Sequence, residues 1–473
     1  MAECQAFSTW LGILEARHAS QPIQLGLERV QAVWSRMGEG RLAPLILSVA
    51  GSNGKGSSVA FLEAILAAAG HRVACYTSPH LLHFSERLRI SGVSLPEAAW
   101  AAAFERVEHA RGELTLTFFE HTTLAAFDLL RRSQVDVAVL EIGMGGRLDA
   151  VNIVAPDGSV ITSIGLDHQA FLGPDRTAIG YEKAGVMRPG VPVVYADADP
   201  VPSIARHADD VCAPLWLSGR DYSLAVAAES SAELPAKLPA ELVAECTAEH
   251  WFLNLPEQRL ELPWPTLAAP IQLQNAAACV ALLYRLRTRW RYSEQALRAG
   301  VAQAQAPGRL QCLAQAPELR FDVAHNPQAM QSVADWLATQ PKRATHWVFG
   351  ALADKDIRSM LGIMKPLVDC TYLIDLSPYS ARGMTSRALV EQAAALDLAH
   401  QDCGSDCALA LSAARAAAGA SGRVLVTGSF VLLEQAYRAV QIDRLLPTDC
   451  HDPPHQHAFA EPTRDPSPGS AFR

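Results

Sequence analysis

Short apolar runs alternate with longer segments of helical periodicity along residues 1–301 of the chain. The apolar runs predict β-strands, and several are apolar throughout, which is typical of strands covered on both faces. This alternation predicts an α/β fold with a doubly wound, mostly parallel sheet, whose ligands lie at the carboxyl ends of the strands. The expected strands are 45–49, 73–77, 135–142, 159–163 and 191–195, and the expected helices are 59–69, 96–111, 121–133 and 176–187.

The pattern is less regular after residue 197 and then resumes in a shorter series. Strand-like pieces stand at 222–227 and 251–255, and a long helix is expected over 271–289. Residues 302–309, Ala-Gln-Ala-Gln-Ala-Pro-Gly-Arg, predict an inter-domain linker because Pro and Gly interrupt regular structure. A second strand–helix series follows, with strands expected at 320–323, 346–350, 371–375 and 423–427.

The length of 473 residues exceeds what a single core usually supports, so we expect two domains. These are a larger doubly wound domain over 1–301 and a smaller Rossmann-like α/β domain over 310–446. Residues 447–473 are rich in Pro, His, Asp and Ser and poor in apolar residues, which predicts a disordered tail. The three histidines that follow Cys450 resemble a metal-binding set, but histidines in such a tail are more often incidental.

Composition limits the classes of partner and compartment. Apolar residues make up 49% and charged residues 19% of the chain, as in a folded protein. The net charge of −9 argues against a general surface for polyanions, so an anionic ligand requires local basic groups. The ten cysteines include no C-x-x-C pair, which predicts reduced thiols. With neither a secretion signal nor an apolar span visible, we expect a cytoplasmic monomer without nucleic-acid or membrane partners.

A glycine-rich turn with one lysine lies between the first predicted strand and helix. Residues 49–58 read Val-Ala-Gly-Ser-Asn-Gly-Lys-Gly-Ser-Ser. Such a turn closes backbone N–H groups around phosphate oxygens, while Lys55 reaches the terminal phosphates and Ser57 offers a hydroxyl to Mg²⁺. Val49 and Gly56 depart from the strict P-loop pattern, so this is a variant P-loop. A plain glycine turn with a solvated lysine is the alternative, but three glycines in six residues favour nucleotide binding.

Other chemistry-bearing residues follow further predicted strands. Ser78 stands at a strand end, and Glu141 ends an apolar strand, where nucleotide enzymes place a carboxylate for Mg²⁺. Gly145 and Gly146 permit close backbone approach to a ligand, and Arg147 beside them is available for an anion.

Several candidates are ambiguous when taken singly. His168 follows a strand, but a lone histidine is more often structural than catalytic. Lys183 lies in a helical pattern, where a solvated lysine is the usual interpretation. In the second domain Asp322 and His325 follow a strand, and Arg309 in the linker would complete a site when the domains close.

In order and spacing, these motifs resemble those of the folylpolyglutamate synthases and dihydrofolate synthases, a branch of the Mur-ligase-like ATP-dependent amide ligases. The resemblance covers nearly the whole predicted folded chain, from residue 25 to 430. The matching blocks are LGLERV, GSNGKGSS, YTSPHL, TFFEHTT, LEIGMGGRLDAVN, TSIGLDH, YEKAGVMRPG, PGR, FDVAHNP, DKDI and TGSF.

The resemblance implies an ATP site, two Mg²⁺ ions and room for K⁺. It identifies Lys55, His168 and Lys183 as catalytic, and Lys183 matches a lysine that is carbamylated in this superfamily. Such an N6-carboxylated lysine is an anion that helps to hold the second metal. The implied metal ligands are Ser57 and Glu141 for one ion and Ser78, Glu141 and His168 for the other. The implied ATP contacts are Gly51, Asn53, Gly54, Lys55, Gly56, Ser57, Asn275, Arg309, Asp322 and His325.

The resemblance also implies ATP, L-glutamate and a folate-type acid as substrates. The γ-phosphoryl group of ATP would move to a substrate carboxylate, and the amine of glutamate would then displace phosphate. The paired LGLERV and TFFEHTT blocks imply that both dihydropteroate and reduced folates are accepted; a single-activity folylpolyglutamate synthase is the alternative. After His168, the Thr-Asp that is frequent in the family is replaced by Gln169-Ala170, whereas Phe171 keeps an aromatic residue where the family often has Trp. The implied acyl-substrate contacts are Leu27, Glu28, Arg29, Phe119, Glu120, Thr123, Arg147 and Asp149.

Three other classes remain as alternatives. A P-loop kinase or GTPase would explain the loop but not the YEKAG, PGR and FDVAHNP blocks, and Asp354-Lys355-Asp356 is not the base-reading motif of a GTPase. A non-catalytic nucleotide-binding regulator would be expected to lack Lys55 or Glu141. A Mur-type cell-wall ligase is the nearest enzymatic alternative.

Overall fold

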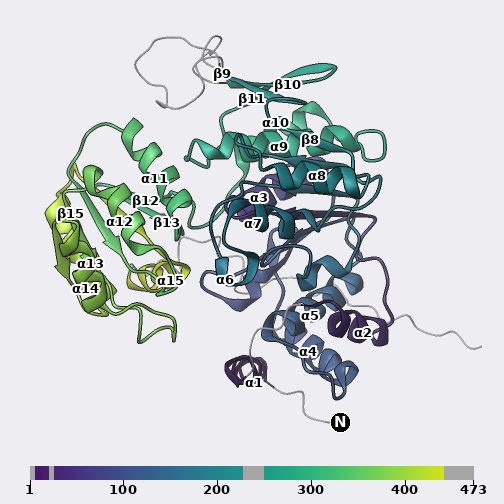
Figure 1. Ribbon diagram of the computed structural model, residues 1–473, viewed down its shortest axis with the longest axis horizontal. Helices are drawn as coiled ribbons and strands as arrows, with labels where there is room; N and C mark the ends of the chain where they lie inside the picture. The colour runs from purple at the N-terminus through teal and green to yellow at the C-terminus, as the bar shows by residue number, and fades with distance from the viewer. Residues whose placement is uncertain (1–5, 21–25, 227–249, 441–473) are drawn as a thin grey trace, which may run out of the picture.

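The computed structural model describes residues 6–20, 26–226 and 250–440, which form two lobes side by side (Figure 1). The larger lobe holds an eight-stranded sheet and a three-stranded sheet, and the smaller lobe holds a six-stranded sheet. Strands alternate with helices in both lobes, so the predicted α/β fold class is confirmed. The expected tail, 447–473, and its histidines lie outside the described residues.

The large sheet has the strand order β4-β3-β2-β5-β1-β6-β7-β8. Six adjacent strands are parallel, namely β2, β5, β1, β6, β7 and β8. The strands β3 and β4 add an antiparallel edge beside β2. The five strands predicted before residue 196 are present, whereas β3 and β4 are too short to show a periodicity. The strands are β1 (Leu45–Ala50), β2 (Val73–Tyr76), β3 (Leu88–Ile90), β4 (Val93–Ser94), β5 (Val137–Glu141), β6 (Gly158–Ile161), β7 (Val193–Tyr195) and β8 (Leu215–Leu217).

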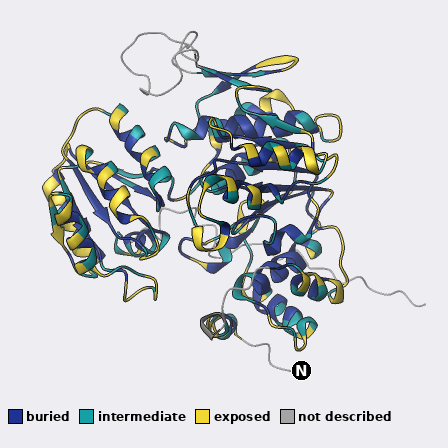
Figure 2. Cartoon of the chain, in the orientation of Figure 1, coloured by how far each residue is buried: buried dark blue, intermediate teal, exposed yellow. Residues whose placement is uncertain are grey.

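Both faces of this sheet are covered, and β1 shows how. All six of its residues are buried. Ile46 and Ala50 join the core that packs against α2, α4 and α5, whereas Leu47 and Val49 join the core against α3, α9 and α10. Side chains of a strand alternate between faces, so a strand that is apolar throughout supplies both cores. Figure 2 shows the sheets as buried layers inside each lobe.

Helices of the larger lobe begin where local capping dictates. The structure starts α3 directly after Gly54, four residues earlier than the periodicity predicts, because the phosphate loop closes onto the helix N-terminus. α5 also begins early, because Thr117 and Glu120 form a reciprocal capping box. The helices are α1 (Phe7–Ser20), α2 (Glu28–Arg36), α3 (Lys55–Ala68), α4 (Glu97–Arg111), α5 (Phe118–Arg132), α6 (Gln169–Leu172), α7 (Arg176–Ala184), α8 (Pro202–Asp210), α9 (Ile271–Leu286) and α10 (Glu294–Gln303), with short 3₁₀ helices η1 (Phe84–Arg87) and η2 (Ala150–Ile153).

A three-stranded antiparallel sheet covers part of α9. Its strands are β9 (Ser223–Val226), β10 (His250–Leu255) and β11 (Gln258–Pro263), in the order β11-β10-β9. Trp251 and Leu253 of β10 are fully buried in the same core as α9. This sheet therefore extends the core of the larger lobe, at the top of the view in Figure 1.

The smaller lobe contains a sheet of order β12-β13-β17-β14-β15-β16, in which only β12 is antiparallel to its neighbour. Val348 of β14 packs into the core with α14 and α15, whereas Trp347 and Phe349 pack with α11 and α12. The elements are β12 (Gln311–Gln315), β13 (Glu318–Asp322), α11 (Pro327–Thr339), β14 (Thr345–Phe349), α12 (Ile357–Met364), η4 (Lys365–Leu367), β15 (Cys370–Leu373), α13 (Ser386–Ala395), β16 (His400–Asp402), α14 (Cys407–Ala418), β17 (Arg423–Thr427) and α15 (Phe430–Ala439).

Among the described helices, none has both the length and the apolar character that crossing a membrane requires. The seven cysteines in the described segments are all free thiols.

Candidate active site between the two lobes

The phosphate loop is shaped by two glycines in left-handed or extended positive-φ conformations. Gly51 has φ +141° and Gly54 has φ +93°. A Cβ on Gly51 would lie 1.7 Å from Thr162 Oγ1, and one on Gly54 would lie 2.6 Å from Asn275 Oδ1. Neither position accepts a side chain, so the loop can keep its backbone N–H groups open toward a ligand.

A cavity of about 410 Å³ lies between the lobes, at the carboxyl ends of the strands of the large sheet. The larger lobe contributes the phosphate loop, the loop after β2 and the end of β5, and the smaller lobe contributes residues such as Lys355, Arg382 and Phe430. Ten of the residues expected from the sequence line it: Gly51, Asn53, Gly54, Lys55, Ser78, Glu141, His168, Lys183, Arg309 and His325.

Two buried lysines converge on the phosphate loop. Lys55 Nζ donates to the carbonyl oxygens of Gly51 at 3.1 Å and Ser52 at 3.3 Å, and Lys183 Nζ donates to Gly51 at 2.8 Å. Burial lowers the pKa of Lys55. Burial, assisted by the charge of Lys55, lowers the pKa of Lys183 to about 7. Lys183 is therefore a buried amine with a large neutral fraction. Its interpretation as a solvated helix lysine is wrong.

Glu141 provides a carboxylate within this cationic surrounding. It is 5% exposed, and the Ser78 N–H lies 3.4 Å from its Oε2. Burial raises the pKa of Glu141, while Lys55 and Arg309 oppose that rise. The end of β5 thus presents a carboxylate with only one long protein hydrogen bond among the described contacts, which suits a group that binds a cation.

Ser57 gives an independent indication of a metal. Its hydroxyl is buried, yet Oγ has no hydrogen-bond partner among the described residues. A buried polar atom of this kind normally has a partner, and a hydroxyl without one fits a group that binds a cation. The described residues contain no group of three His, Cys, Asp or Glu side chains suited to a metal. The residues present instead fit Mg²⁺, which uses one or two carboxylates and completes its shell with water and phosphate oxygens.

His168 lies on the loop after β6 in a left-handed conformation, with φ +51°. It lines the cavity, and burial lowers its pKa to about 4, so the ring is neutral at physiological pH. A neutral imidazole can act as a metal ligand. Its place on the cavity wall and its neutral ring are both compatible with the role expected from the sequence, which stays a prediction.

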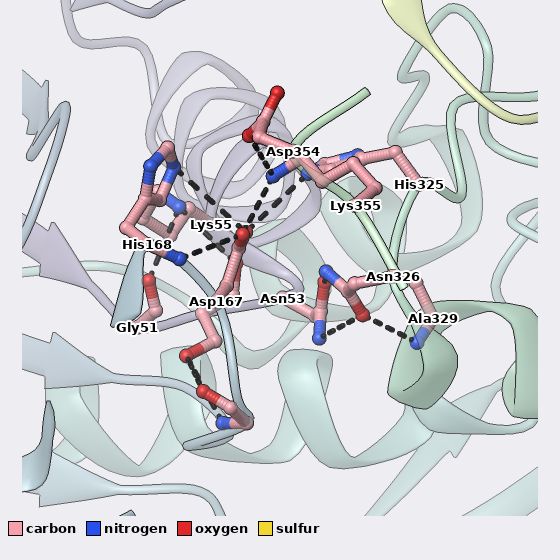
Figure 3. Close-up of polar contacts among 12 residues, drawn as sticks. Gly51, Asn53, Lys55, Asp167, His168, His325, Asn326, Ala329, Asp354 and Lys355 are labelled. Carbon is pink, nitrogen blue, oxygen red and sulfur yellow. Dashed lines mark hydrogen bonds and ion pairs between the residues drawn. The ribbon is translucent and has the colours of Figure 1, made fainter. Parts of the chain in front are cut away.

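Asp167 is the centre of an ion-pair network between the lobes (Figure 3). Its carboxylate lies 2.6 Å from Lys355 Nζ and 3.5 Å from His325 Nε2, both from the smaller lobe. It also accepts the backbone N–H of His168 at 2.9 Å. Burial favours the neutral acid, but the hydrogen bond from His325 and the charge of Lys355 outweigh it and lower the pKa of Asp167. Asp167 is therefore ionised and ties the two lobes together.

A second contact joins the phosphate loop directly to the smaller lobe. Asn53 and Asn326 exchange side-chain hydrogen bonds of 3.2 and 2.9 Å (Figure 3). Asn53 also donates to Gln328 at 2.7 Å. Asn326 caps α11 by accepting the Ala329 N–H. These hydrogen bonds hold the start of α11 against the phosphate loop.

Four expected ATP contacts lie behind the cavity surface. Gly56 and Ser57 are in the first turn of α3, and a Cβ on Gly56 would lie 3.3 Å from Arg309. Asn275 packs against Gly54. Asp322 is buried and accepts the backbone N–H groups of residues 310 and 324 at 2.8 and 2.7 Å, which fixes the backbone beside Arg309.

None of the residues expected on the acyl-substrate side lines this cavity. Arg29 pairs with the buried Glu120 at 2.7 Å. Phe119 packs so tightly on Gly143, which does line the cavity, that a Cβ there would lie 2.4 Å from the ring. The remaining members are Leu27 before α2, Glu28 at its first turn, Thr123 with a 3.1 Å hydrogen bond to Tyr76, Arg147 paired with Glu182 at 2.8 Å, and Asp149, which accepts the Met144 and Val151 N–H groups at 2.8 and 2.9 Å.

Sequence reasoning missed several residues that the structure brings to the cavity. Asp167 was overlooked beside His168, although an acidic residue directly after a strand is itself a signal. Lys355 belongs to a recognised block, but nothing local showed that it faces the other lobe. His80 and Arg382 also line the cavity and carry no expected role.

Comparisons with known proteins agree with this geometry. The model of the Mur ligase middle domain matches residues 49–283, and that of the Mur ligase glutamate ligase domain matches residues 308–430. Fold and site therefore define a Mur-type ligase. The chain is 40% identical over 425 residues to the dihydrofolate synthase/folylpolyglutamate synthase of Escherichia coli, covering 89% of this chain and 93% of that one.

Solved structures give the same result. The chain superposes with a TM-score of 0.83 on Escherichia coli FolC in complex with DHPP and ADP, at 39% identity, covering 93% of this chain and 99% of the other. The Yersinia pestis bifunctional folylpolyglutamate synthase/dihydrofolate synthase with AMPPNP and a manganese ion gives 0.81, at 38% identity and 92% and 98% coverage. The chain belongs to the dihydrofolate synthase/folylpolyglutamate synthase family.

Proposed function

We propose that this chain is an ATP-dependent ligase that joins L-glutamate to dihydropteroate, giving dihydrofolate, and to reduced folates, giving folylpolyglutamates. The observation that carries the proposal is the cavity between the lobes, where a variant P-loop, Glu141 and the unpartnered Ser57 hydroxyl meet residues of the glutamate ligase domain. The similarity to relatives that are named for both activities supports the choice of substrates.

The reaction forms an amide in two balanced steps. A substrate carboxylate attacks the γ-phosphorus of ATP, so that an acyl phosphate forms and ADP leaves. The neutral amine of glutamate then attacks the acyl carbon, the C–O bond to phosphate breaks, and inorganic phosphate departs with a proton released. Lys55 and the loop N–H groups stabilise charge on the transferred phosphoryl group. The contacts between the lobes exclude water that would otherwise hydrolyse the acyl phosphate.

We assign Ser57 and Glu141 to one Mg²⁺ and Ser78, Glu141 and His168 to a second. When bound, these ions would neutralise phosphate charge and fix the in-line arrangement of the reacting groups. We further propose that Lys183 is N6-carboxylated and that K⁺ has a place in the site. The neutral amine that burial favours at Lys183 is the form that adds CO₂.

We assign the ATP contacts and the acyl-substrate contacts as the sequence predicts them. The pairing of Arg29 with Glu120 and the packing of Phe119 on Gly143 support these assignments. We call Arg29, Phe119 and Glu120 the acyl-substrate wall. We also propose two domains, 1–301 and 310–446, that move about the linker, in a protein that acts as a cytoplasmic monomer.

Phosphate release is the direct test. The purified chain is assayed with ATP, Mg²⁺ and L-glutamate in three separate reactions. The acceptor in these reactions is dihydropteroate, tetrahydrofolate or a UDP-muramyl substrate. We expect glutamate-dependent release with the first two. Release with tetrahydrofolate alone would leave a single-activity folylpolyglutamate synthase, and release with only the UDP-muramyl substrate would refute the proposal.

A further inference from the structure

His80 lines the cavity on the loop after β2, yet no role proposed above uses it. This loop is held firmly in place. The Glu86 carboxylate accepts the N–H groups of Leu81, Leu82 and His83 at 2.8, 2.9 and 2.7 Å. The imidazole of His80 therefore reaches the cavity from a fixed backbone.

Arg87 fixes the ring as well. Its Nε donates to His80 Nδ1 at 3.0 Å. Arg87 is only 7% exposed, and its guanidinium lies over the rings of Phe84 and Phe118, at 5.2 and 5.5 Å. Aromatic faces on this side leave the guanidinium little freedom to move away from the histidine.

The contact determines the tautomer of His80. A guanidinium has N–H donors and no acceptor, so Nδ1 of His80 must supply a lone pair. A doubly protonated ring would place one N–H against another. The ring is therefore neutral with its proton on Nε2, and no protein partner of Nε2 is found among the described residues.

We propose that His80 is a hydrogen-bond donor, through Nε2–H, to a carboxyl oxygen of a substrate in the cavity, and that Arg87 positions it. This inference rests on the proposed function, in which both the acyl substrate and glutamate carry carboxylates. The acyl carboxyl group is the expected partner, because Arg87 packs on Phe118, next to the acyl-substrate wall, and His80 is two residues from Ser78. The same tautomer excludes His80 as the base that deprotonates the incoming amine, because Nδ1 is already engaged.

Two substitutions separate the donor from the acceptor. His80→Gln keeps an N–H donor near the position of Nε2, whereas His80→Asn keeps an acceptor near Nδ1 for Arg87 but removes the donor. We expect kcat/KM to fall about 10- to 100-fold in His80→Asn, the range for one hydrogen bond to a charged group, and only a few-fold in His80→Gln. His83→Asn is the matched control, because His83 is exposed on the same loop and does not line the cavity.

Separate KM values identify the partner. A raised KM for the acyl substrate or a lowered kcat supports the acyl carboxyl group, and a raised KM for glutamate alone moves the donor to the glutamate carboxylate. The affinity for AMPPNP should be unchanged in every variant. A substitution that only damaged the structure of the site would lower this affinity as well. Full activity of His80→Asn, or equal losses in both variants together with lost AMPPNP binding, would overturn the proposal.

Arg87 is tested through its coupling to His80. The double variant Arg87→Gln/His80→Asn should lose no more activity than His80→Asn alone, because Arg87 acts through the ring. Additive losses would refute the positioning role. Histidine ¹⁵N spectra give a readout that needs no turnover: the signal lost in His80→Asn should show unprotonated Nδ1 and protonated Nε2. A wild-type protein without turnover but with this signature would refute the proposed function and leave the tautomer intact, whereas the opposite tautomer would refute the inference itself.

Discussion

Asp167→Asn should separate the two lobes, because it removes the charge that holds Lys355 across the cavity. The two side chains are only 10% and 6% exposed, and their charged atoms lie 2.6 Å apart. The other carboxylate near Lys355 is Asp354, at 3.9 Å, and Asp354 is itself engaged by Arg382 at 2.7 Å. In the variant, Lys355 would keep a buried charge without an adequate partner unless the lobes open.

The expected magnitude follows from this burial. Breaking a buried ion pair by removing one partner costs about 3–5 kcal/mol, and we take about 3 kcal/mol because Asp354 and cavity water remain near Lys355. That corresponds to a change of roughly 100-fold in the ratio of closed to open molecules. The amide of asparagine still accepts the His168 N–H, so the backbone of the loop after β6 should remain in place.

Small-angle X-ray scattering and steady-state kinetics measure the two consequences. Asp167→Asn should increase the radius of gyration and lower kcat/KM about 100-fold, while Asp167→Asn/Lys355→Met should return to the compact form without recovering activity. The control is Asp354→Asn, which breaks a pair with the half-exposed Arg382 and should cost at most about 1 kcal/mol. A compact Asp167→Asn protein with normal kcat/KM would refute the idea that this ion pair closes the lobes.

Four further outcomes are expected. Lys55→Ala should abolish phosphate release with every acceptor, since it removes the ammonium group that stabilises charge on the transferred phosphoryl group, and retained turnover would mean that the loop is misread. Gly54→Ala should lower the affinity for AMPPNP about 10-fold or more by calorimetry, because its Cβ would lie 2.6 Å from Asn275. With a pKa of about 7, Lys183 loses its proton as pH rises through neutrality, so a ¹³C carbamate signal from labelled bicarbonate should grow between about pH 6 and 8 and be absent in Lys183→Met. Chelation of Mg²⁺ should stop turnover reversibly. Ser57→Ala should raise the Mg²⁺ concentration needed for half-maximal rate about 10-fold without lowering the melting temperature, because the hydroxyl has no partner among the described residues.

The residues that follow parallel strands were predictable from the sequence. Glu141 ends β5 and Ser78 follows β2, and the neighbouring parallel strands of one sheet necessarily bring their carboxyl ends together. Lys183 was harder, because helical periodicity alone does not distinguish a solvated lysine from one that reaches back to the loop. Its burial depends on how α7 packs, which only the resemblance indicated.

Contacts between the lobes could not be predicted from local pattern. Asp167 and Lys355 are 188 residues apart, and their pairing depends on the relative orientation of two independently built sheets. The contact of Arg87 with His80 is near in sequence, but it requires the chain to turn through η1, and no periodicity describes a single 3₁₀ turn. The α3 and α5 starts were misplaced for a related reason, since capping residues rather than apolar spacing determine where a helix begins.

The charges of the cavity connect the proposed lysine modification to the metals. The chain has a net charge of −9, yet the cavity is lined by five basic side chains and three carboxylates: Lys55, Lys183, Arg309, Lys355 and Arg382 against Glu141, Asp167 and Glu434. This local excess of positive charge attracts ATP and carboxylate substrates, but it also leaves little need for divalent cations. Carboxylation of Lys183 would convert one of the basic side chains into an anion, so that four basic and four acidic groups would line the cavity. Metal binding would then become favourable beside the phosphates, so the affinity for Mg²⁺ and the occupancy of the carbamate should rise together, and each should fall when the other is removed.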